Sequence, residues 1–251
     1  MRKIALIPAR GGSKRIPNKN IKDFCGKPII AYPIATALES NLFDEVIVST
    51  DSHTIAQIAI DYGAKVPFMR PEHLSDDFTP TANVANHAIE MLHLTQDDLL
   101  CVIYPTAPLL NAKSLNLGYH ALQDSAYLFS FSAVAYDYTP YRSFCFKNGE
   151  IAMLFPAHYA KRSQDLEQVY HDAGQFYFGK AKAWQEALPI FAPHSYAIIL
   201  KSYQVQDIDT LDDWQMAEIK YKLQESLNDE KSLESHSFEW VQNVECEIKR
   251  V

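Results

Sequence analysis

The chain has 251 residues, and its 31 acidic and 23 basic side chains give it a formal net charge of −8. This balance argues against a nucleic-acid partner, because duplex binding depends on broad cationic neutralisation of phosphates. Hydrophobic residues make up 47% and charged residues 22%, which is ordinary for a globular chain with ample material for a core.

Segments that would place the chain in a membrane or outside the cell are not evident. No apolar run reaches the roughly 18 residues that a membrane-spanning helix needs, so we expect no membrane partner. The chain starts directly with a strand pattern and lacks a signal-peptide pattern, which predicts a cytosolic protein. The cysteines are scattered, with no Cys-x-x-Cys pair, and indicate neither a zinc site nor a disulfide framework.

Strand-like runs alternate with amphipathic stretches along the first 135 residues. Strands are predicted at 3–8, 45–50, 65–69, 99–104 and 127–134, and helices at 28–40, 52–62 and 80–93. In the third helix we expect Thr79 as N-cap and Pro80 at the first helical position. Alternation of this kind implies a parallel sheet with right-handed crossovers, covered on both faces, in a Rossmann-like α/β fold.

The alternation breaks between about 136 and 172, where no helix of ordinary length is evident. Asn148-Gly149 is a favourable hairpin turn with apolar residues on both sides, so we interpret the segment as a hairpin excursion from the sheet. Strands resume at 175–178 and 196–200, and a long helix follows at about 210–226. We therefore expect one domain over 1–226 and an acidic C-terminal extension over 227–251.

Residues 4–20 join a buried strand directly to a basic loop. The first 22 residues carry seven Lys or Arg and no acid, on a chain that is acidic as a whole. Loops at the carboxyl ends of parallel strands are where open α/β sheets bind ligands, and Gly11 and Gly12 allow backbone N–H groups to approach an anion. The loop predicts a polyphosphate site, although it matches neither the Walker pattern nor Gly-x-Gly-x-x-Gly. Formal charge at this site would come from Arg10, Lys14 and Lys19.

Two carboxylates, Asp207 and Asp209, follow the predicted strand 196–200. Alternate residues of an extended segment point the same way. Two carboxylates opposite a polyphosphate loop suit Mg²⁺, which takes hard oxygen ligands completed by water and substrate phosphate. The alternative is an acidic helix start, where capping and the macrodipole favour Asp. The residues alone leave both interpretations open.

Three other loops that follow predicted strands carry polar side chains. Asp51 lies in a segment, 49–52, that helix capping alone would explain. Thr79 and Thr81 could bind a ribose or a base edge, or could equally cap the third helix. Tyr104 ends the fourth predicted strand.

The segment after the hairpin carries a second group of polar residues. Arg162 has a planar fork that suits a carboxylate, although an exposed pair with Asp165 would explain it and would be worth little. From sequence alone, His171 is interpreted as a turn residue. The remaining histidines lack the spacing of metal ligands.

Three motifs of the chain together resemble those of the CMP-sugar synthetases, the cytidylyltransferases that activate nine-carbon acidic sugars. They are the segment 4–20, the Arg-Ser-Gln-Asp at 162–165 and the Asp-x-Asp at 207–209. The resemblance runs from the first strand to about residue 225. It implies a nucleotidyltransferase type A-like fold and an enzyme that transfers CMP from CTP to the anomeric hydroxyl of an α-keto acid sugar, releasing pyrophosphate. It also implies a homodimer formed through the 136–172 excursion, which would reach toward the partner's active site.

The resemblance assigns roles to the polar residues of the loops. It makes Asp207 and Asp209 ligands of Mg²⁺ and gives a catalytic role to them together with Arg10 and Lys19. The nucleotide-binding residues that it implies are Ala9, Arg10, Gly11, Gly12, Lys14, Lys19, Asn20, Asp51, Thr79 and Thr81. The sugar-binding residues that it implies are Tyr104, Arg162, Gln164, Asp165, His171, Gln175 and Tyr177.

Two features point to one branch of the family. Many sialic acid synthetases have Gln where this chain has Tyr104, which argues against ordinary N-acetylneuraminate. The stretch from His171 to Tyr177 looks most like the pseudaminic acid branch. The alternatives are legionaminate or N-acetylneuraminate as the sugar and, in another class, a non-catalytic nucleotide-binding regulator. A nicotinamide dehydrogenase is disfavoured because Gly-x-Gly-x-x-Gly is missing.

Overall fold

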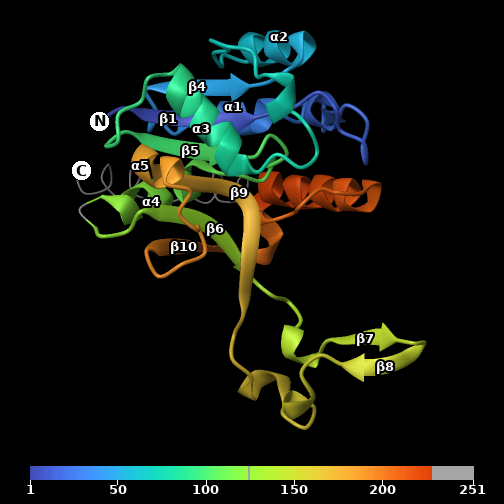
Figure 1. Ribbon diagram of the computed structural model, residues 1–251. Coiled ribbons are helices and arrows are strands. Elements are labelled where there is room, and N and C mark those ends of the chain that lie inside the picture. Colours follow the sequence, from blue (N-terminus) through green and yellow to red (C-terminus); the bar gives the residue numbers. More distant parts are fainter. Residues whose placement is uncertain (124, 228–251) are drawn as a thin grey trace, which may run out of the picture.

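A six-stranded sheet forms the centre of the computed structural model, which describes residues 1–123 and 125–227 (Figure 1). Five strands run parallel, and β9 runs antiparallel between β5 and β6. The predicted mostly parallel, Rossmann-like sheet is therefore confirmed. In sheet order the strands are β4 (Glu45–Ser49), β1 (Lys3–Pro8), β5 (Leu99–Ile103), β9 (Tyr170–Lys180), β6 (Phe129–Ala135) and β10 (Ser195–Leu200).

In this mostly parallel sheet, β9 runs against its neighbours. The chain leaves β6 at its carboxyl end, makes the excursion, and re-enters the sheet from the same end as β9 (Figure 1). Because no crossover helix carries the chain back to the opposite edge, β9 must run against its neighbours.

Helices cover both faces of the sheet, because each strand alternates its apolar side chains between them. Ala5 and Ile7 of β1 belong to one buried cluster with α1, α2 and α4, whereas Ile4 and Leu6 belong to another with α3 and α5. The helices on the first face are α1 (Ala31–Glu39), α2 (His53–Asp61) and α4 (Ala112–Leu122). Those on the second are α3 (Thr81–Met91) and α5 (Ala181–Gln185).

Helix α4 was missed by the sequence analysis. Gly118 lowers its helix propensity, yet Gly118 is required there, because a Cβ at this position would lie 2.7 Å from the Phe176 ring. The available signal was Asn111, whose side chain caps the helix by accepting from the Ser114 N–H at 2.9 Å.

Two local expectations were wrong. The predicted strand 65–69 forms only isolated bridges to β4, at Lys65 and Met69, since Pro67 between them has no N–H for the ladder. Helix α3 starts at Thr81, one residue later than predicted, with Pro80 at its N-cap. The Thr79 hydroxyl instead bonds to Asp76 Oδ1 at 2.7 Å.

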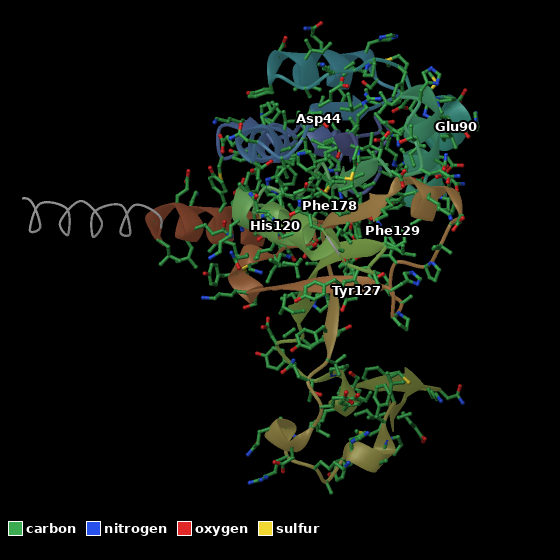
Figure 2. The ribbon with its side chains drawn as sticks, turned by 90° about the vertical axis from the view of Figure 1, so that its left-hand side faces the viewer. Asp44, Glu90, His120, Tyr127, Phe129 and Phe178 are labelled. Carbon is green, nitrogen blue, oxygen red and sulfur yellow. The ribbon has the colours of Figure 1, made fainter. Side chains whose placement is uncertain are left out.

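The excursion projects from the sheet as a separate lobe (Figures 1 and 2). It contains the hairpin strands β7 (Phe144–Lys147) and β8 (Glu150–Met153). Asn148 and Gly149 between them have φ angles of 52° and 84°, the positive values that the Asn-Gly turn prediction requires. The predicted hairpin is therefore confirmed.

A third apolar cluster fixes the loop after β10. Ile208 is fully buried with Phe24 and Trp214, and so joins three parts of the chain. Phe24 comes from a small ribbon of β2 (Asp23–Phe24) and β3 (Lys27–Pro28), and Trp214 comes from a helix over 211–227. Residues 228–251, most of the predicted extension, lie outside the described residues. No helix in the described part is long and apolar enough to cross a membrane.

Candidate active site

The loops at the carboxyl ends of the parallel strands meet along one edge of the sheet, and two cavities open there. The first, of about 480 Å³, lies over β1 and β5 and is lined by residues that follow them. The second, of about 400 Å³, lies over β6 and β10 and is lined by residues that follow those strands and by the start of β9. This is the edge where open α/β sheets bind ligands.

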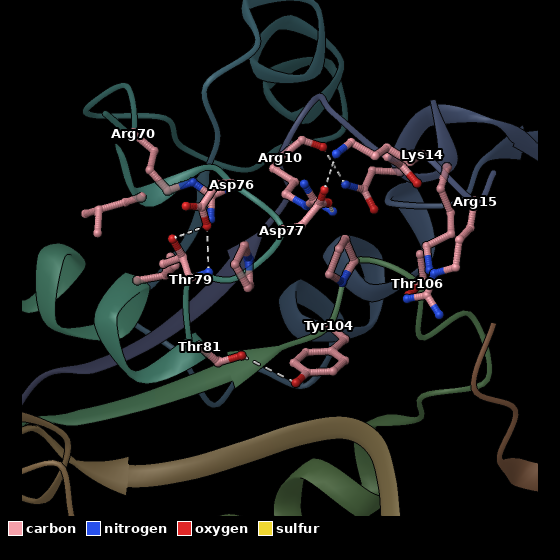
Figure 3. A pocket seen from close by; sticks show the side chains of 17 residues that line it. Arg10, Lys14, Arg15, Arg70, Asp76, Asp77, Thr79, Thr81, Tyr104 and Thr106 are labelled. Carbon is pink, nitrogen blue, oxygen red and sulfur yellow. Dashed lines mark hydrogen bonds and ion pairs between the residues drawn. The ribbon is translucent and has the colours of Figure 1, made fainter. Parts of the chain in front are cut away.

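The first cavity gathers most of the predicted nucleotide-binding residues, together with one that was assigned to the sugar. The predicted residues that line it are Arg10, Lys14, Lys19, Asn20, Thr79, Thr81 and Tyr104. Polar residues that line it without having been predicted are Ser13, Arg15, Arg70, Asp76, Asp77 and Thr106. Figure 3 shows that these side chains come from the basic loop, from the segment before α3 and from the end of β5.

Two of the predicted phosphate-binding cations pair with one carboxylate. Arg10 Nη2 contacts Asp77 Oδ1, and Lys14 Nζ lies 2.6 Å from Asp77 Oδ2 (Figure 3). These two contacts hold the pKa of Asp77 below its usual value. The loop before α3 therefore places an anion against the cations that an incoming polyphosphate would need.

Several predicted residues support the basic loop and do not line the cavity. The Gly11 N–H donates to Asp51 Oδ1 at 2.8 Å, so in this structure it is directed away from an anion, contrary to the expectation for this glycine. Ala9 is buried, and its N–H donates to the Ser49 carbonyl. Gly12 has open space around it, with only the Arg10 side chain near.

Arg70 is the main residue that the sequence analysis missed. It is only 6% exposed, it lines the cavity, and its Nε and Nη2 atoms have no hydrogen-bond partner among the described residues. Burial lowers its pKa. An unpartnered buried guanidinium is costly, which favours a ligand acceptor at this position. Its only sequence signal was an Arg after an apolar run.

Thr81 and Tyr104 line the first cavity, and Tyr104 is connected through Tyr177 to Asp172 of the second cavity. The hydroxyls of Thr81 and Tyr104 lie 3.4 Å apart (Figure 3). The Tyr104 ring packs against Tyr177 with centroids 5.4 Å apart. Tyr177 is buried, and its hydroxyl donates to Asp172 Oδ2.

The second cavity is acidic and contains both predicted metal ligands. Its lining includes three predicted residues, Asp207, Asp209 and His171. The polar lining residues that were not predicted are Asp137, Asp172, Gln206, Asp213 and Lys220. Lys220 donates to the Val205 carbonyl at 2.6 Å and to Gln206 Oε1 at 2.9 Å. This lysine ties the 211–227 helix to the loop that carries the carboxylates.

The two interpretations of the acidic segment 207–213, metal binding and helix capping, apply to different residues. Asp213 Oδ2 accepts from the Thr210 N–H at 2.8 Å, and Thr210 Oγ1 accepts from the Asp213 N–H at 3.2 Å, which is a capping box. Capping therefore explains Asp213. It does not account for Asp207 and Asp209, which lie on either side of the buried Ile208.

Cations from the basic loop reach the carboxylate pair. Arg15 Nη1 lies 2.5 Å and Lys19 Nζ 3.6 Å from Asp209, and Lys19 Nζ also donates to the Ile208 carbonyl at 2.5 Å. Burial lowers the pKa of Lys19. Desolvation, followed by the charge of Asp209, raises the pKa of Asp207. A cation between these carboxylates would relieve their repulsion.

Four predicted sugar-binding residues lie elsewhere. Arg162 pairs with Asp165 through two bonds of 2.7 and 3.0 Å on the exposed excursion, and Gln164 lies in the same turn, so these three line neither cavity. Gln175 is buried, and its Nε2 donates to the Gln204 carbonyl at 2.5 Å, so its side chain does not face the cavity as expected.

The comparisons with known proteins agree on one family. Residues 4–209 match the cytidylyltransferase family. The chain is 46% identical over 226 residues to a pseudaminic acid cytidylyltransferase of Campylobacter jejuni, covering 89% of this chain and 97% of that one. It is 33% identical over 234 residues to a CMP-N,N'-diacetyllegionaminic acid synthase of Legionella pneumophila, covering 87% and 95%.

A solved structure shows the same fold. It is that of a CMP:2-keto-3-deoxy-manno-octonic acid synthetase complexed with CTP, which matches with a TM-score of 0.67 at 17% identity over 89% of this chain and 100% of that one. The sheet and its helices thus define a protein of the nucleotidyltransferase fold. Within that class, the chain belongs to the cytidylyltransferase family, as its sequence motifs predicted.

Asp77→Asn tests whether this carboxylate competes with a bound polyphosphate. Removing its charge frees Arg10 and Lys14, so the dissociation constant of CTP measured by calorimetry is expected to fall roughly 2- to 10-fold, as two exposed ion pairs imply. Asp76→Asn is the matched control, because Asp76 bonds to Thr79 and touches neither cation. Weaker CTP binding by Asp77→Asn would contradict the prediction.

Proposed function

We propose that this chain transfers CMP from CTP to the anomeric hydroxyl of pseudaminic acid, with release of pyrophosphate. The observation that carries the proposal is the 46% identity over nearly the full length of a pseudaminic acid cytidylyltransferase, against 33% for the legionaminic acid relative. The basic cavity beside an acidic one supports it, because a triphosphate suits the first, while carboxylates of the second could hold a metal ion near the α-phosphate that is transferred to the sugar.

CTP would occupy the first cavity. Arg10, Lys14 and Lys19 would hold the triphosphate, with Asn20 nearby. Thr79 and Arg70, from the opposite part of the cavity, would contact the nucleoside (Figure 3). The Arg70 fork suits a carbonyl oxygen of the base, because a buried donor pair needs an acceptor.

The sugar would occupy the second cavity, beyond Tyr104 and Tyr177. Its anomeric hydroxyl would attack the α-phosphorus, forming one P–O bond as the bond to the leaving pyrophosphate breaks, and the hydroxyl proton would pass to water. The chain supplies no covalent nucleophile in this scheme. It contributes by positioning two reactants at one edge and by neutralising the charge of the leaving group with Lys14 and Lys19.

The residues present fit Mg²⁺. Asp207 and Asp209 offer carboxylate oxygens beside the polyphosphate loop, and Mg²⁺ commonly takes one or two carboxylates while water and substrate phosphate complete its shell. Among the described residues, no group of three His, Cys, Asp or Glu side chains is arranged to hold a metal ion. When bound, the ion would supply charge neutralisation at the α-phosphate.

The reaction and the sugar are tested together by pyrophosphate release with CTP and Mg²⁺. Pseudaminic, legionaminic and N-acetylneuraminic acids are compared at equal concentrations. We expect the highest kcat/KM with pseudaminic acid. Preference for either other sugar would overturn the sugar assignment and keep the reaction, and no turnover with any sugar would favour the non-catalytic regulator.

Asp207→Asn and Asp209→Asn test the metal carboxylates. Each is expected to lower kcat by about 10²-fold or more, the loss that removal of one electrostatic transition-state contact typically causes. Both are also expected to raise the Mg²⁺ concentration at half-maximal rate. The matched control is Asp212→Asn in the first turn of the helix over 211–227, which follows the loop that carries Asp207 and Asp209. A full rate at ordinary Mg²⁺ in either variant would exclude that carboxylate as a ligand.

Arg70→Lys tests recognition of the nucleoside by the buried guanidinium. The variant keeps the charge and loses the planar fork, so the KM for CTP is expected to rise about 10-fold with little change in the KM for the sugar. Steady-state kinetics with each substrate varied in turn measures both constants. An unchanged KM for CTP would remove Arg70 from the nucleotide site.

We further propose a homodimer in which the excursion brings Arg162 to the partner's sugar cavity. The hairpin exposes large apolar side chains, including Phe146 with 70% and Ile151 with 67% of its surface exposed. Exposed apolar patches of this kind mark protein–protein interaction sites. Arg162 lines neither cavity of its own chain, and its planar fork, which pairs with Asp165 here, could instead bind the carboxylate of a sugar in the partner's cavity.

Mixed dimers test this arrangement. Arg162→Ala and Asp207→Asn chains are each expected to be nearly inactive alone. When they are mixed and re-equilibrated, sites formed from the intact halves should restore up to about a quarter of wild-type activity. Sedimentation establishes the dimer in the same samples. A monomer in sedimentation, or mixtures with no regained activity, would contradict the proposal.

A further inference from the structure

Asp172 occupies a position in the acidic cavity that neither the motifs nor the metal site accounts for. It lies at the start of β9 and lines the cavity with Asp207 and Asp209. We propose that Asp172 is a specificity-determining residue of the sugar site, where its carboxylate accepts a hydrogen bond from an N–H or O–H group of the sugar. The proposal rests on the function proposed above.

The backbone around Asp172 is built to aim this side chain. Pairing of β6 with β9 is regular up to Phe131–Tyr177 and resumes at Ala133–Asp172, so residues 173–176 lie opposite Ser132 alone. The Ser132 hydroxyl accepts from the N–H groups of Gln175 and Phe176, at 3.2 and 3.3 Å. A bulge of this kind bends the strand and redirects side chains, and such bulges are common beside active sites.

A glycine makes the bulge possible. Gly174 has a φ of 62°, in the left-handed region that L side chains rarely adopt. A Cβ at this position would also meet the Tyr104 ring at 4.0 Å. Gly174 thus allows the turn and lies beside the Tyr104 ring, which lines the first cavity.

Two donors hold the Asp172 carboxylate in one orientation. Oδ1 accepts from the Gly174 N–H at 2.9 Å, and Oδ2 accepts from the Tyr177 hydroxyl. A carboxylate has about four acceptor sites, so two remain for a ligand in the cavity. Because the Tyr177 ring is buried against Tyr104, the position of this acceptor is tied to the end of the nucleotide cavity.

An ionised carboxylate discriminates among ligand groups in two ways. It can only accept, so it favours an acylamino N–H or a hydroxyl of the sugar. It repels the sugar's own carboxylate, and this repulsion would favour one orientation of the ring over the reverse. Epimers of a nine-carbon acid place their donors in different directions, so a fixed acceptor separates them.

Asp172→Asn tests the proposal with a variant of equal size. Its Oδ1 can still accept from Gly174, so the bulge is retained, whereas one acceptor becomes a donor and the charge is lost. The kcat/KM for pseudaminic acid is expected to fall about 10- to 100-fold, the range for hydrogen bonds to charged groups. The KM for CTP and the Mg²⁺ dependence should be unchanged, and the preference over legionaminic acid should narrow.

Tyr177→Phe provides a second, independent variant. It removes the hydroxyl that orients Asp172 and keeps the ring that packs on Tyr104, so the same change in sugar preference is expected with a smaller loss. Tyr119→Phe on α4 is the matched control, since it removes a hydroxyl that bonds only to Gln123. It should leave all constants unchanged.

Three results would overturn the inference. They are an unchanged kcat/KM for the sugar in Asp172→Asn, an equal loss with all three sugars, or a shift confined to the Mg²⁺ dependence, which would make Asp172 a metal ligand. The wild-type chain in the same assay separates this failure from failure of the proposed function. Wild-type turnover with an unaltered variant rejects only the role of Asp172, and absence of wild-type turnover rejects both.

Discussion

The bond from Lys19 to the Ile208 carbonyl connects the two halves of the candidate site. It joins the basic loop after β1 to the loop after β10, which lie 189 residues apart in sequence. Burial of Ile208 with Phe24 and Trp214 holds that loop in place and leaves Asp207 and Asp209 facing the cavity. Strand direction places both loops at one edge of the sheet, and this contact holds the cations of the first loop close to the carboxylates of the second.

Opposite charges balance one another along this edge. Asp77 pairs with Arg10 and Lys14, and Asp209 pairs with Arg15 and Lys19, so each cation proposed to hold the triphosphate has an anion beside it. When polyphosphate and metal bind, the phosphates would replace the carboxylates as partners of the cations, and the metal would replace the cations as partner of the carboxylates. The number of charge pairs would therefore change little. The buried guanidinium of Arg70 differs, because the described residues offer its Nε and Nη2 no partner to exchange.

The sequence predicted elements wherever a short-range pattern controls them. Period and capping located the edges of β1, β4, β5 and α2 to within about two residues, and the Asn148-Gly149 pair located the hairpin turn. It failed where a distant contact overrides propensity. Position 118 of α4 must be glycine because the Phe176 ring leaves no room for a Cβ, so a contact from β9 explains the residue that weakens the helix pattern. The 65–69 segment failed for a local reason, because Pro67 interrupts its pairing.

The amino-acid sequence alone determined the basic loop and the Asp-x-Asp pair, because each is encoded by residues close together in the chain, and the resemblance of these motifs to known ones indicated the family. Only the tertiary structure decided which of these residues share a cavity. It added Arg70 and Asp172, removed Gln175 from the cavity surface, and showed that Arg162 pairs with Asp165 and lines neither cavity. The physical reason is that burial, strand direction and the β9 bulge depend on pairings between residues far apart in sequence, which no local pattern records.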